Sequence, residues 1–73
     1  MRPRVDWETV ISDLQATGLY QSELAEMLRS SYVTVLHMKH RGREPKFRTG
    51  EALIEIWAQK TGKAEASVPR VAR

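Results

Sequence analysis

The stretch SSYVTVLHMKHRGREP, from Ser30 to Pro45, decides the fold of this chain. Its first half is rich in β-branched and aromatic side chains, which favour strands. A strand needs a partner, but no other segment alternates clearly between apolar and polar residues. In a helix, Val35 and Met38 would share one face, and Ser31 would cap the N-terminus. The context therefore predicts a helix over about 31–41, against the local β preference.

Three further amphipathic helices are predicted around this one. The first spans about 6–17, the second about 21–28 and the last about 50–61, with Thr49 as its cap. Residues 63–73 show no periodicity, which predicts a loose basic tail. The apolar faces of the three helices contain Trp7, Val10, Ile11 and Leu14, then Leu24, Met27 and Leu28, and finally Ala52, Leu53, Ile56 and Trp57. The expected fold is therefore all-α.

Composition limits the class of protein. A chain of 73 residues forms one small domain, and without cysteine it has neither a disulfide nor a thiolate metal site. No apolar run reaches the roughly 20 residues that span a bilayer, and no apolar stretch follows Met1–Arg4 as in a signal peptide. No membrane association is expected, and the absence of cysteine is compatible with the cytoplasm.

Positive charge is concentrated in the middle of the chain. The formal net charge is +3, but residues 31–50 hold five Lys or Arg side chains against Glu44 alone, with two histidines among them. The five are Lys39, Arg41, Arg43, Lys46 and Arg48. Such a block is a plausible phosphate-binding footprint, and the alternative is a solvated basic face.

Catalytic and metal-binding patterns are weak. There is no cysteine, no glycine-rich phosphate loop and no pair of acids beside a histidine. His37 and His40 have a spacing that would suit a metal, but no neighbouring Cys or Asp completes a site. We therefore expect no enzyme, no cofactor and no small-molecule ligand.

The predicted short helix, three-residue break and second helix suggest a helix-turn-helix, in which the small Ala25 lets the two helices approach closely. In detail, the sequence resembles the phage-repressor/Cro-type helix-turn-helix family over about residues 6–62. The matching positions are Gly18, Leu19, Gln21, Leu24, Ala25, Leu28, Ser31, Val35, Met38, Gly42 and Pro45. Arg29 stands at the turn position that is usually glycine in that family, and a left-handed backbone there would be strained.

The resemblance implies a small four- or five-helix bundle with a helix-turn-helix DNA-binding domain in 1–62. The segment 63–73, which has no periodicity, would follow this domain as a flexible basic tail. The resemblance also implies a homodimer on double-stranded DNA, with the 31–41 helix in the major groove. Such a chain would be a small Cro-like transcriptional regulator, acting at the nucleoid, or in the host cytoplasm if a phage encodes it.

The implied contacts fall into two classes. Base contacts are assigned to Ser31, Tyr32, Val33, Leu36, His37 and His40. Phosphate contacts are assigned to Gln21, Lys39, Arg41, Arg43, Lys46 and Arg48. The base-contact set lacks the Arg, Gln and Asn side chains that bind guanine or adenine through two hydrogen bonds. Val33 and Leu36 could pack on thymine methyl groups, and the histidines could donate to guanine.

Another class of function remains open. Tyr32, Val33 and Leu36 could instead form an apolar patch that docks a protein, with the helix-turn-helix serving as an interaction module. A basic helix on a membrane surface is less well supported, because the basic block is not paired with a wide apolar face.

Overall fold

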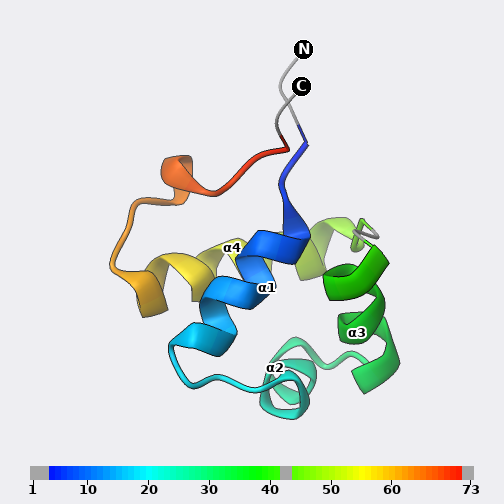
Figure 1. Ribbon diagram of the computed structural model, residues 1–73. Coiled ribbons are helices and arrows are strands. Elements are labelled where there is room, and N and C mark those ends of the chain that lie inside the picture. The colour runs from blue at the N-terminus through cyan, green and yellow to red at the C-terminus, as the bar shows by residue number, and fades with distance from the viewer. Residues whose placement is uncertain (1–3, 42–43, 72–73) are drawn as a thin grey trace.

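The computed structural model describes residues 4–41 and 44–71. Within these ranges the domain is all-α, as predicted, with four helices, one short 3₁₀ turn and a single isolated β-bridge (Figure 1). The elements are α1 (Trp7–Ala16), α2 (Gln21–Leu28), α3 (Tyr32–Arg41), α4 (Phe47–Thr61) and η1 (Glu65–Ser67). The part of the Ser30–Pro45 stretch that is rich in β-branched residues is therefore helical. None of the helices in the described ranges is long and apolar enough to cross a bilayer.

The N-terminus of α1 forms as the sequence predicts. Asp6 caps the helix: its Oδ1 accepts from the Thr9 amide at 3.2 Å, and its Oδ2 accepts from Thr9 Oγ1 at 2.7 Å. The chain leaves α1 at Gly18, which has a φ of +97° that glycine adopts without steric cost. These local signals place α1 within one residue of its predicted bounds at each end.

One apolar core joins the four helices. Its buried side chains are Trp7, Val10, Ile11, Leu14, Leu24, Ala25, Val35, Met38, Leu53, Trp57 and Val68. The core includes both tryptophans, and Trp57 Nε1 donates to Asp13 Oδ2 of α1 at 3.0 Å. Met27 departs from the predicted apolar face of α2, because half of its surface is exposed.

Helix α4 begins three residues before its predicted start. Thr49 lies inside its first turn and does not cap it; Lys46, in an extended conformation, precedes the helix. The sequence pattern misplaced this start because Gly50 resembles a loop residue. In the structure Gly50 is a buried helical residue, and a Cβ atom there would lie 3.2 Å from Cη2 of Trp7. The glycine thus lets the Trp7 indole pack directly on α4.

The segment after α4 also differs from the loose tail expected from the sequence. It turns through η1 and returns to the start of α1, where Val5 and Arg70 form the antiparallel bridge (Figure 1). The Asp6 amide donates to the Pro69 carbonyl at 2.9 Å, and Val68 is buried in the core. As far as residue 71, this segment is therefore part of the packed domain.

Candidate nucleic-acid interface

The candidate surface is organised by the short connection between α2 and α3. Arg29 adopts a left-handed backbone with φ 54° and ψ 37°, and the Ser30 amide donates to the Ala25 carbonyl at 2.9 Å. Ala25 is buried in the core, and α2 packs against α3. The connection between the two helices is three residues long, 29–31.

The outer face of α3 gathers four of the six predicted base-contact residues. Val33, Leu36, His37 and His40 follow one another at helical spacing, on the side opposite the buried Val35 and Met38. Val33 is 55% exposed and His40 is exposed, whereas Leu36 and His37 are half-buried. A helical face of this kind is available to another molecule.

The other two predicted base-contact residues are engaged within the protein. Ser31 caps α3, with its Oγ accepting from the Thr34 amide at 3.1 Å and lying 2.8 Å from Thr34 Oγ1. The Tyr32 hydroxyl donates to Gln21 Oε1 at 2.9 Å. Although both side chains are exposed, their hydroxyl groups already have partners beside the outer face of α3.

Five of the six predicted phosphate-contact residues lie in the described part of the chain. Arg41, Lys46 and Arg48 are exposed, and Gln21 is half-buried at the start of α2. Lys39 differs from the prediction, because its Nζ donates to Gln15 Oε1 of α1 and is therefore directed toward that helix. Arg43 lies outside the described residues.

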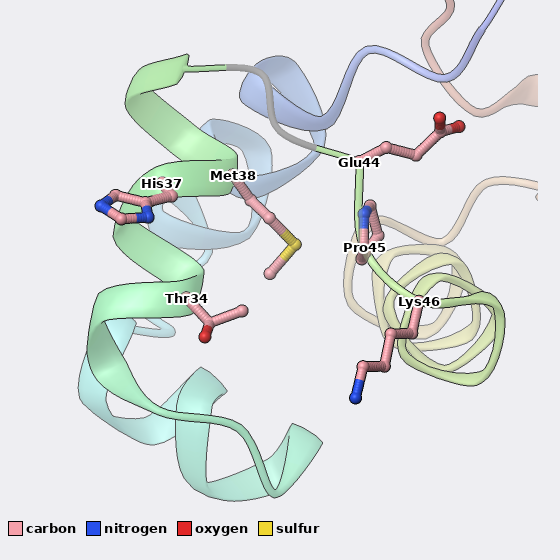
Figure 2. Close-up of a pocket in the computed structure, with 6 residues that line it drawn as sticks. All are labelled: Thr34, His37, Met38, Glu44, Pro45 and Lys46. Atoms are coloured by element: carbon pink, nitrogen blue, oxygen red, sulfur yellow. The ribbon is translucent and has the colours of Figure 1, made fainter.

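A groove separates α3 from the start of α4. One part of it, about 270 Å³, is lined by Thr34, His37, Met38, Glu44, Pro45 and Lys46. Figure 2 shows Thr34 and Met38 pointing into this hollow, Lys46 across from Thr34, and the His37 ring directed away on the outer side of α3. A second hollow, about 340 Å³, is lined by Leu28, Arg29, Ser30, Thr34, Pro45, Lys46 and Thr49. The two hollows share Thr34, Pro45 and Lys46 and are therefore neighbours between α3 and the start of α4.

Arg29 is a candidate that the sequence analysis did not assign to the interface. It is exposed and lines the second hollow together with Lys46 and three hydroxyl-bearing side chains, Ser30, Thr34 and Thr49. Arg, Lys, Ser and Thr side chains commonly contact nucleic-acid phosphates. Arg29 could have been found as the basic residue that directly follows α2 in the connection to α3. The sequence analysis considered only the backbone strain expected at its turn position.

In the described part of the chain, no cluster of three or more His, Cys, Asp or Glu side chains could hold a metal ion.

No protein-family model, curated protein or solved structure matches the chain. Its function is therefore inferred from the surface around α3.

Proposed function

We propose that this domain binds double-stranded DNA in a sequence-dependent manner, with α2 and α3 acting as a helix-turn-helix of the phage-repressor/Cro type. The observation that carries the proposal is the outer face of α3, where Val33 and His40 are exposed. This face lies between two sets of side chains that we assign to phosphate contacts. Gln21 of α2 stands on one side, and Arg29 and Lys46 line the groove on the other.

The geometry of α3 supports this placement. Tyr32 and Thr34 lie on opposite flanks of Val33, because successive helical residues are about 100° apart. Tyr32 bonds to Gln21, whereas Thr34 faces the groove that contains Lys46. The major groove of B-DNA is about 12 Å wide and admits one helix, so phosphates of both strands would border α3. Groups on both flanks of one exposed helix suit that arrangement.

The charge distribution supports duplex binding as well. Phosphate contacts carry most of the sequence-independent affinity, and their number sets the dependence of binding on salt. Arg41, Lys46 and Arg48 are exposed in the basic block, and Arg29 adds a fourth cation beside it. The biological role we propose is that of a small transcriptional regulator, acting as a homodimer on two half-sites about one helical turn apart.

Fluorescence anisotropy with a labelled random-sequence duplex tests the proposal. We expect binding that weakens steeply between about 50 and about 200 mM salt. Lys46→Ala should weaken binding and lower the salt slope by about one. The matched control is Lys60→Ala, since Lys60 is exposed at the far end of α4. Absence of binding at the lower salt concentration would overturn the proposal.

The rival function is protein docking on the same surface. Its support is the exposure of apolar and aromatic side chains in the α2–α3 region: Tyr20 is 67% exposed, and Met27, Tyr32 and Val33 are each at least half exposed. A partner held by such a patch would dissociate little when salt is raised, and Val33→Ser would weaken it strongly. Strong salt dependence of duplex binding, together with the Lys46→Ala effect, separates the two functions.

A further inference from the structure

We propose that Val33 recognises the C5-methyl group of thymine, so that the preferred duplexes carry a thymine opposite the first turn of α3. This inference rests on the DNA binding proposed above and deepens it by assigning one specificity-determining residue. It also assigns the methyl contact to Val33 alone among the predicted base-contact residues, because the structure distinguishes Val33 from the other residues at the start of α3.

Position is the first argument for Val33. It lies in the first turn of α3, on the side opposite the buried Val35 and Met38. In a helix-turn-helix the N-terminal residues of the second helix approach base edges most closely. The Val33 side chain is 55% exposed, so its two methyl groups are available for contact.

Hydrogen bonding supplies the second argument. The three polar neighbours of Val33 each have a hydrogen-bond partner within the protein: Ser31 and Thr34 bond to each other, and the Tyr32 hydroxyl donates to Gln21. The unengaged side chain of this turn is therefore the apolar Val33. These bonds occupy the hydroxyl proton of Tyr32 and orient the Ser31 and Thr34 hydroxyl groups toward each other.

The chemistry of base edges then selects thymine. In the major groove thymine presents a methyl group beside its O4 acceptor, whereas the polar groups that guanine, cytosine and adenine present there are donors or acceptors without a methyl group. A valine packed against such a polar edge would exclude water and leave the donor or acceptor unpaired, at a cost in free energy. Packed against the thymine methyl, the same valine buries apolar surface on both sides.

Leu36 provides a matched comparison. It also lies on the outer face of α3 but is half-buried and one turn further along the helix. The sequence alone assigned both side chains to thymine equally. The greater exposure of Val33 and its place in the first turn assign the methyl contact to Val33.

The test compares thymine with deoxyuridine, which differs from it only by lacking the methyl group. Duplexes are first enriched from a random pool with the wild-type protein, and each thymine in the enriched duplex is then replaced singly by deoxyuridine. We expect one replacement per half-site to weaken binding about fourfold, as expected from loss of one buried methyl-sized group. In Val33→Ala the same replacement should have no effect, whereas in Leu36→Ala the fourfold loss should remain.

The variants remain informative because Val33 is largely exposed and alanine has the higher helix propensity. Circular dichroism verifies that both variants stay folded. Salt-dependent binding that is indifferent to deoxyuridine, or a loss that persists in Val33→Ala, would overturn this inference and leave DNA binding intact. Absence of any duplex binding at about 50 mM salt would overturn both proposals.

Discussion

The hydroxyl of Tyr32 at the start of α3 donates to Oε1 of Gln21 at the start of α2, across 2.9 Å. Because the amide oxygen is occupied, the two N–H donors of the Gln21 amide remain for another acceptor. They lie in the first turn of α2, where backbone N–H groups lack intrahelical partners and favour anions. The bond therefore holds Gln21, which we propose contacts phosphate, beside the proposed DNA-reading face.

Replacement of Tyr32 by phenylalanine tests this coupling. The hydroxyl is exposed, so we expect Tyr32→Phe to change the free energy of unfolding by no more than about 1 kcal/mol. Duplex binding should weaken several-fold, because the Gln21 amide loses its fixed orientation. In a double-mutant cycle measured by anisotropy, Gln21→Ala and Tyr32→Phe should be strongly non-additive. Additive losses would show that the two side chains act independently.

Replacement of Arg29 by glycine should have opposite effects on stability and binding. Its left-handed backbone costs about 1 kcal/mol with an arginine but not with glycine, so Arg29→Gly should raise the melting temperature by about 4–8 °C. Loss of the cation that lines the groove should weaken duplex binding and lower its salt slope by about one.

Arg29→Ala is the matched control for this prediction. Alanine also strains the left-handed backbone, so this variant should lose binding without gaining stability. Calorimetry and anisotropy give the two quantities. Equal melting temperatures for the glycine and alanine variants would mean that the turn stores no strain at this residue.

Local patterns predicted most of the helices because their apolar faces repeat with the helical period. Val35 and Met38 identified α3 correctly even though its residues favour strands, since burial in the core outweighs local propensity. The start of α4 was misplaced because Gly50 has a packing role that depends on Trp7, which is distant in sequence. A pattern within one helix contains no information about such a partner.

The candidate site was also predicted only in part from the sequence. The resemblance to the phage-repressor/Cro-type family assigned Val33 and His37 to one face of the 31–41 helix, and both lie on the outer face of α3. The interactions that engage Tyr32 and Lys39 are with residues of α2 and α1, 11 and 24 positions away in the chain. Predicting them requires the packing of the helices, so the sequence assigned both residues to DNA contacts without their internal partners.

The hydrogen bond from Trp57 to Asp13 should stabilise the core. Trp57 is 1% exposed, and its Nε1 donates to the Asp13 carboxylate. Asp13→Ala leaves this buried donor without a partner, which should lower the free energy of unfolding by about 1–3 kcal/mol. Asp13→Asn keeps an oxygen acceptor and should cost less. Urea denaturation followed by circular dichroism measures both, and an alanine variant as stable as the wild type would contradict the assignment.

The segment after α4 should contribute to the stability of the whole domain. Val68 is 5% exposed and belongs to the core, although no apolar periodicity around it indicates burial. Val68→Ala removes two buried methyl groups and should lower the free energy of unfolding by about 1–3 kcal/mol, which is a large fraction for a domain of this size. Val71→Ala is the matched control, because Val71 is 39% exposed and should tolerate the change. Thermal and urea unfolding of the two variants measure the difference. If Val68→Ala unfolds like Val71→Ala, the segment adds little to the core; the expected gap would instead show that the packed domain extends beyond α4.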